Sequence, residues 1–172
     1  EGRGDIAVGN LTVTPERRKR VDFSAPFLTN VSEVVITGPG SARVATVDDL
    51  AGREIYVRKS SSYYESLSRL NETFAKAGKA KMTLRLADEN LEDGDLIEMV
   101  NAGMIPMVVV DDHKARFWAQ VFDQVTVHPD VAVHSGGEIA WAFRKNSPKL
   151  RAVVDAFAEK HKKGTLFGNI MF

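Results

Sequence analysis

Residues 11–27 read LTVTPERRKRVDFSAPF, and this stretch is the most informative part of the chain. Pro15 has a backbone φ suited to the first position of a turn or helix, and the residue before a proline is held extended. A strand is therefore expected to end near Thr14. Thr12 and Arg17 then share one short segment, where a hydroxyl and a planar guanidinium suit bidentate binding of a carboxylate. The alternative is a capped helix start on the surface.

Composition narrows the class of protein. The chain has 172 residues, 44% apolar and 27% charged, which allows one large domain or two small lobes. Lys plus Arg and Asp plus Glu balance at 23 each, so we expect no nucleic-acid partner. No apolar run approaches the roughly 20 residues that span a bilayer. There is no cysteine, the four histidines are scattered, and no phosphate-binding or nucleophile motif occurs, so no metal or cofactor is expected.

Strands and helices alternate through the middle of the chain, which predicts a doubly wound α/β layer with a largely parallel sheet. The run Met107–Val110 is apolar throughout, as in a strand buried on both faces. Strands are expected over 5–9, 31–37, 54–57, 82–86, 107–110, 125–127 and 139–143, and helices over 63–77, 93–103, 112–121 and 148–162.

The domain organisation follows from the lengths of these segments. Residues 37–130 should form a complete second lobe. Residues 1–36 and 131–172 are each too short for a core of their own, so we expect them to combine into a partial first lobe. Two connecting strands, near 29–37 and 128–138, would form a hinge, and a small ligand would bind in the cleft between the lobes.

Two further segments carry groups suited to a zwitterionic ligand. Ser60, Ser61 and Ser62 lie where a strand meets a helix, and a helix N-terminus attracts anions. The alternative is a serine-capped helix without a ligand. Asp111 and Asp112 follow the buried strand, and such residues face the ligand crevice of a doubly wound sheet. Helix capping is the alternative for either aspartate.

The pattern T-x-T-x-x-R followed by D-F-S-x-P-[FY] is present at residues 12–17 and 22–27. It resembles the signature of bacterial periplasmic solute-binding proteins of family 3, the amino-acid-binding type. The resemblance implies the type II fold of periplasmic binding proteins, a periplasmic location and a non-enzymatic binding role. It implies that Thr12 and Arg17 hold the α-carboxylate of a bound amino acid.

The same resemblance assigns the remaining site residues. Donors to the carboxylate would come from the turn at residues 60–62, where serine replaces the family's usual glycine. The α-ammonium would pair with Asp111, with Asp112 as the second choice. A main-chain carbonyl near Asn10 would accept a hydrogen bond from the same ammonium.

Residues 58–64 and 163–169 more narrowly resemble the solute-binding-type domain of membrane-bound lytic transglycosylase F and its relatives. In those proteins the module binds amino acids or muropeptides and regulates a fused domain that cleaves peptidoglycan. A regulatory sensor with such a fused domain is therefore the leading hypothesis. The alternatives are a binding protein that serves an ABC permease, a dehydratase-type enzyme on the same scaffold, and an interaction domain with a vestigial cleft.

Family members begin with a further βαβ stretch of the first lobe, which this sequence does not show. Its absence would leave a strand edge and an apolar face uncovered. We therefore expect a dimer, an exchange of segments between copies, or a first lobe that stays partly formed.

Overall fold

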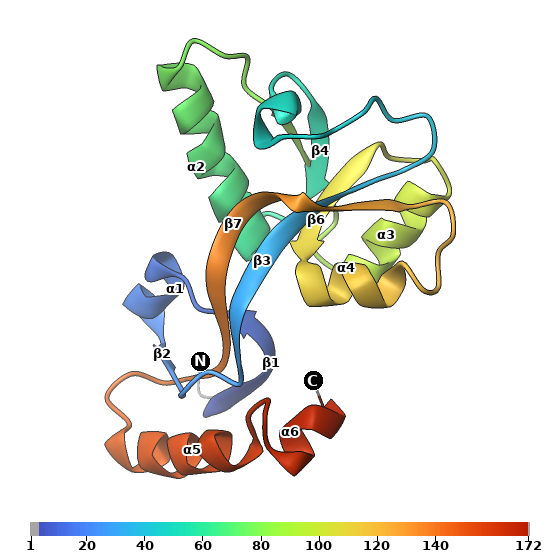
Figure 1. Ribbon diagram of the computed structural model, residues 1–172. Coiled ribbons are helices and arrows are strands. Elements are labelled where there is room, and N and C mark those ends of the chain that lie inside the picture. Colours follow the sequence, from blue (N-terminus) through green and yellow to red (C-terminus); the bar gives the residue numbers. More distant parts are fainter. Residues whose placement is uncertain (1–3, 172) are drawn as a thin grey trace. The chain divides into compact units, whose positions relative to one another are not determined.

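The computed structural model describes residues 4–171 and divides into two compact units. Unit 1 consists of Glu1–Val31 and Gly136–Phe172, and unit 2 consists of Ser32–Ser135. The chain passes between the units along two long strands, β3 (Leu28–Thr37) and β7 (Thr126–Phe143) (Figure 1). Each unit therefore has its own elements and its own packing.

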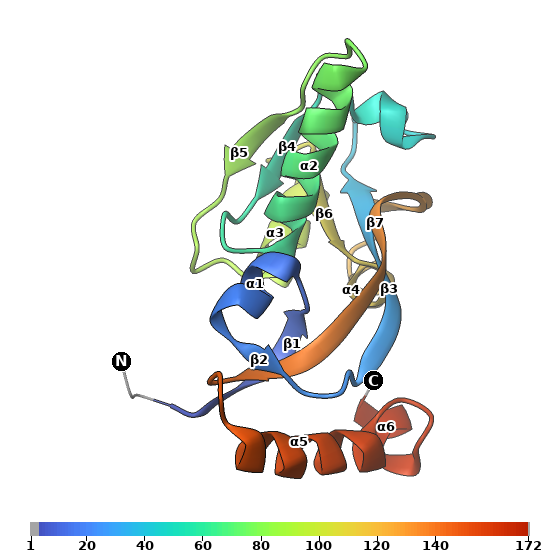
Figure 2. The ribbon, with the colours of Figure 1, turned by 90° about the vertical axis from the view of Figure 1, so that its left-hand side faces the viewer.

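Unit 2 is an α/β layer with a mixed sheet. Its strand order is β3-β6-β4-β5, with β4 parallel to both β5 and β6 and with β3 antiparallel to β6. In Figures 1 and 2, α2 lies on one side of this sheet and α3 and α4 on the other. The predicted α/β class is thus confirmed. The elements are β4 (Glu54–Val57), β5 (Thr83–Leu86), β6 (Met107–Asp111), η1 (Val47–Leu50), α2 (Ser62–Lys76), α3 (Asp93–Asn101) and α4 (Asp112–Trp118).

The core of unit 2 explains why these elements form. All five residues of β6 are buried, as expected for a strand covered on both faces. Helix α2 places Leu67 and Phe74 in the same core, and its opposite face is polar. Helix α3 contributes Ile97 and Val100 from the other side of the sheet. This core fixes the ends of β3 and β6, where the polar groups described below lie.

Unit 1 is smaller. The strands β1 (Ile6–Thr12) and β2 (Asp22–Phe23) both pair antiparallel with the last part of β7. Helix α1 (Pro15–Arg20) joins the two strands, and α5 (Pro148–His161) and α6 (Leu166–Met171) follow β7 (Figure 2). The ring of Trp141 lies between those of Phe27 and Phe157, with centroid distances of 4.4 and 5.4 Å. The Phe27 ring is tilted against Trp141 and the Phe157 ring is stacked on it, and the second contact holds α5 against β7.

Strand β7 differs from the sequence prediction. Separate strands over 125–127 and 139–143 were expected, whereas β7 is one strand of 18 residues. Gly136 adopts a φ of 74°, which only glycine adopts without strain, and so the strand continues through a turn-like residue. At Gly137 an added Cβ would come 3.1 Å from the carbonyl oxygen of Val31. Gly136 therefore lets β7 continue through a positive φ, and Gly137 lets the backbone of β7 lie close to Val31. Neither glycine ends the strand.

Candidate functional site

In unit 1, Thr12 and Arg17 lie together. Thr12 is the buried last residue of β1, and its carbonyl oxygen accepts a hydrogen bond of 2.9 Å from Nη1 of Arg17. Arg17 stands in the short helix α1, which begins because Thr14 caps it and Pro15 occupies its first turn. The Thr14 hydroxyl accepts a hydrogen bond of 3.2 Å from the Arg17 N–H. Helix capping and the approach of the guanidinium to Thr12 therefore occur in the same segment. Asn10 is an exposed residue of β1.

In unit 2, the three serines before α2 have different surroundings. Ser60 is exposed, and its hydroxyl donates to the carboxylate of Glu89. Ser61 is the N-cap of α2: its hydroxyl accepts a hydrogen bond of 3.2 Å from the Tyr64 N–H and donates to the Arg58 carbonyl oxygen at 2.7 Å. Ser62 is buried within the first turn. The capping that the sequence suggested is therefore present at Ser61.

Asp111 ends β6 and is 1% exposed. Its N–H donates to the hydroxyl oxygen of Tyr63 at 3.2 Å, while its side chain makes no capping hydrogen bond to α4. Both of its carboxylate oxygens are buried without a hydrogen bond, and the Lys114 ammonium is 3.4 Å from Oδ2. Asp112 instead accepts from the Ser32 N–H at 3.4 Å and pairs with Arg116 at 2.8 Å. Among the described residues, Asp112 therefore has a hydrogen-bond donor for its carboxylate, whereas Asp111 has none.

A buried ionic network supports Asp111, and sequence reasoning missed it. The carboxylate of Asp93 contacts Nη2 of Arg58 at 2.9 Å, Nζ of Lys114 at 2.6 Å and the hydroxyl of Tyr63 at 3.0 Å. Burial alone would raise the pKa of Asp93, but Lys114 and Arg58 bring this pKa below its usual value. Burial, together with the charges of Asp111 and Asp93, raises the pKa of Tyr63 well above its usual value. Tyr63 therefore remains a neutral hydroxyl that links Asp111 to Asp93.

Glu33 is a second functional candidate that the sequence analysis did not select. It is 1% exposed in β3 and is the register partner of Asp111 in β6. Both Glu33 carboxyl oxygens are buried, and no residue between 4 and 171 makes a hydrogen bond to them. Burial is the main cause that raises the pKa of Glu33, and the charge of Asp111 acts in the same direction. One signal was present: Glu33 is the only charged residue between Leu28 and Thr37, and it directly precedes the apolar run Val34–Ile36.

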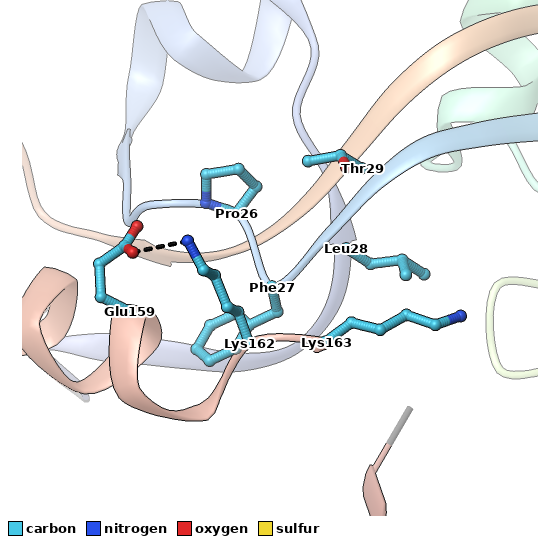
Figure 3. A pocket seen from close by; sticks show the side chains of 7 residues that line it. All are labelled: Pro26, Phe27, Leu28, Thr29, Glu159, Lys162 and Lys163. Carbon is cyan, nitrogen blue, oxygen red and sulfur yellow. Dashed lines mark hydrogen bonds and ion pairs between the residues drawn. The ribbon is translucent and has the colours of Figure 1, made fainter. Parts of the chain in front are cut away.

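Unit 1 has a further hollow of about 510 Å³, which Figure 3 shows. The Lys162 ammonium there pairs with Glu159 at 2.7 Å, and the Lys163 side chain points away from this pair (Figure 3). None of the predicted ligand residues lines this hollow. Its lining residues are Pro26, Phe27, Leu28, Thr29, Glu159, Lys162 and Lys163.

Comparison with known proteins identifies the family. The model of the bacterial extracellular solute-binding proteins, family 3, matches residues 1–170, and the chain belongs to this family. Among solved structures, the substrate-binding protein of an amino acid ABC transporter superposes with a TM-score of 0.79 at 20% identity, covering 99% of this chain and 70% of that chain. The substrate-binding protein AbpA from Streptococcus pneumoniae, bound to L-arginine, has a TM-score of 0.70 at 25% identity, covering 92% of this chain and 62% of that one.

Curated relatives fall into two groups. The membrane-bound lytic murein transglycosylase F of Saccharophagus degradans is 32% identical over 143 residues, which are 81% of this chain and 26% of the relative. The L-cystine-binding protein TcyJ of Escherichia coli is 28% identical over 165 residues, 95% of this chain and 58% of the relative. The chain thus spans about a quarter of the first relative and over half of the second. Between residues 4 and 171, no helix has the length and apolar character needed to cross a membrane.

Proposed function

We propose that this chain is a binding domain for a small zwitterion, an amino acid or a peptidoglycan-derived peptide, and that it catalyses no reaction itself. Arg17 and Thr12 would hold the ligand carboxylate from unit 1. Asp111 would hold the ligand ammonium from unit 2. The observation that carries the proposal is the position of the Arg17 guanidinium, 2.9 Å from the Thr12 carbonyl oxygen, within the segment that matches the family signature.

The side-chain chemistry of Arg17 and of Asp111 supports this assignment. A guanidinium offers several N–H donors in one plane, a geometry that suits both a main-chain carbonyl and a carboxylate. The buried Asp111 carboxylate has the Lys114 ammonium at 3.4 Å but accepts no hydrogen bond among the described residues, and a buried carboxylate with incomplete hydrogen bonding is costly. A ligand ammonium would supply the missing donors. Ser60, Ser61 and Ser62 would contribute through the positive end of the α2 dipole, and a carbonyl near Asn10 would add an acceptor.

The biological setting is proposed from the relatives. The transglycosylase F proteins favour a regulatory module fused to a peptidoglycan-cleaving domain, and TcyJ favours delivery of an amino acid to an ABC permease. The leading proposal is the regulatory module, since transglycosylase F proteins of three bacteria are 27–32% identical to this chain over 81–98% of its length. Both settings are consistent with a periplasmic location. The dehydratase alternative would need a general acid beside a substrate ring, and no described contact favours it.

We further propose that two copies associate through unit 1. Strand β1 is the edge of the sheet order, and its residues Ile6 and Val8 are 37% and 63% exposed. An edge strand can pair with the same strand of a second copy about a twofold axis. Such pairing would cover Ile6 and Val8 and satisfy the outer backbone groups of β1.

Titration calorimetry with L-arginine, L-glutamine, L-cystine and a muropeptide tests the binding role. We expect saturable binding of at least one of these ligands, with a loss of about ten- to hundredfold in affinity on Arg17→Ala, because a charge-assisted hydrogen bond contributes about 1.5–3 kcal/mol. Arg18→Ala is the matched control, since Arg18 lies on the exposed side of α1 and faces Glu138 at 3.8 Å. Equal losses in the two variants, or no binding by the wild type, would refute the proposal.

A further inference from the structure

The carboxyl groups of Glu33 and Asp111 lie side by side inside unit 2. They occupy opposite positions of the antiparallel pair β3 and β6, so both side chains project from the same face of the sheet. Each residue is 1% exposed, and within the described part of the chain none of their four carboxyl oxygens has a hydrogen-bond partner. Two ionised carboxylates in this position would repel each other without water to screen them.

The cations near Glu33 and Asp111 are too few to neutralise the nearby carboxyl groups if all of these are ionised. Lys114 is shared between Asp93 at 2.6 Å and Asp111 at 3.4 Å, and Arg58 pairs with Asp93. Three acidic side chains therefore face two permanent cations. Burial lowers the pKa of His113 and so favours its neutral form, while the charge of Asp111 acts in the opposite direction. One further positive charge or one proton is needed to neutralise the cluster.

The surroundings indicate which carboxyl group carries that proton. Asp111 faces the Lys114 ammonium from α4, together with His113, Asp93 and the Tyr63 hydroxyl. Glu33 faces the hydroxyls of Ser62 and Ser66 from α2, His134 from β7 and Asp111 itself. Burial raises the pKa of both carboxyl groups. Because the permanent cation lies beside Asp111, the negative charge is the more stable of the two on Asp111 and the proton is the more stable on Glu33.

We propose that Glu33 is a positioning residue that holds one proton beside Asp111, keeps Asp111 as the single buried carboxylate available to the ligand ammonium, and releases the proton when the ammonium binds. This inference rests on the proposed function, because it takes Asp111 as the ammonium-binding group. The released proton passes from the Glu33 carboxyl group to solvent. The arriving ammonium replaces its charge, so the cluster stays neutral. Ligand binding is then linked to pH through Glu33.

The first test needs no ligand. A ¹³C NMR titration of the carboxyl groups compares Glu33 with Glu72, an exposed glutamate of α2. We expect Glu33 to titrate at higher pH than Glu72 in the wild type, and Asp111→Asn to lower the Glu33 midpoint, because that variant removes the neighbouring negative charge. A Glu33 that titrates together with Glu72 would overturn the inference, and this comparison within one molecule does not depend on the variant folding.

The second test uses calorimetry with L-arginine as the probe. Binding heats are measured in phosphate and in imidazole at one pH below the Glu33 midpoint, because the two buffers differ in ionisation enthalpy. We expect the wild type to release protons on binding and Glu33→Gln to lose this release. Glu72→Gln, which removes an exposed carboxylate from the same unit, should behave as the wild type. Equal proton release in wild type and Glu33→Gln would overturn the inference.

The two tests separate this inference from the proposed function. Binding of L-arginine without proton release leaves the binding role in place and refutes the role of Glu33. If no ligand of the panel binds, the proposed function fails, and the NMR titration still decides whether Glu33 holds a proton beside Asp111.

Discussion

Nη1 of Arg17 donates a hydrogen bond of 2.9 Å to the carbonyl oxygen of Thr12, five residues earlier in the chain. This bond closes the β1–α1 turn and fixes the guanidinium plane. The conservative substitution Arg17→Lys keeps the charge and loses this planar geometry. We expect Arg17→Lys to weaken binding of a carboxylate ligand about tenfold or more, measured by calorimetry. Affinity equal to that of the wild type would show that only the charge at position 17 matters.

The N-cap of α2 gives a prediction for stability. Ser61→Ala removes the acceptor for the Tyr64 N–H and should lower the free energy of unfolding by about 1 kcal/mol, measured by urea denaturation. Ser60→Ala is the control, because Ser60 is exposed and does not cap the helix. A larger loss for Ser60→Ala than for Ser61→Ala would contradict the described start of α2.

Asp93 gives a prediction for pH dependence. Its pKa in the folded state lies below the usual value of 3.8, so its ionic contacts contribute stability that is fully present above that pH. This contribution is lost as the pH falls through the folded-state pKa. Asp93→Asn should therefore be less stable than the wild type at neutral pH, with the difference shrinking in acid. The check is the free energy of unfolding between pH 2 and 7. A difference that grows in acid would contradict the network.

Tyr63 should matter through its hydroxyl as well as its ring. The hydroxyl donates to Asp93 at 3.0 Å and accepts from the Asp111 N–H at 3.2 Å. Tyr63→Phe leaves both buried partners without this bond and should cost about 1–3 kcal/mol in the free energy of unfolding. Tyr64→Phe serves as the control on the half-buried neighbouring tyrosine. Equal stability of Tyr63→Phe and wild type would refute the link between the two aspartates.

Self-association through β1 is tested by light scattering after gel filtration. We expect the chain to elute as a dimer and Val8→Lys to shift it toward monomer, because a charge on an edge strand opposes pairing. Val121→Lys changes a comparably exposed valine, 58% against 63%, in unit 2 and should leave the dimer intact. A monomeric wild type would refute this association.

The residues that sequence reasoning placed well are those governed by local rules. Strand β4 has the predicted bounds, and α2 lies one residue from its predicted start and end, because a serine cap and apolar spacing define it. Asp111 was selected as a candidate because it follows the run Met107–Val110, which is apolar throughout, and its role as a ligand contact stays a prediction. Pairing across the sheet is not local. Sequence patterns therefore could not show that β7 is continuous or that Glu33 lies opposite Asp111, and only the structure revealed both. The short helix α6 was also not predicted from the sequence.

The central claim is that Arg17 holds the carboxylate of the ligand, and a thermodynamic cycle tests it most directly. Calorimetry compares L-arginine with agmatine, the same molecule without its carboxylate, on the wild type and on Arg17→Ala. We expect loss of the carboxylate to weaken binding to the wild type about ten- to hundredfold and to have little effect on Arg17→Ala, because the two changes remove the same interaction. An equal loss in both proteins would contradict it.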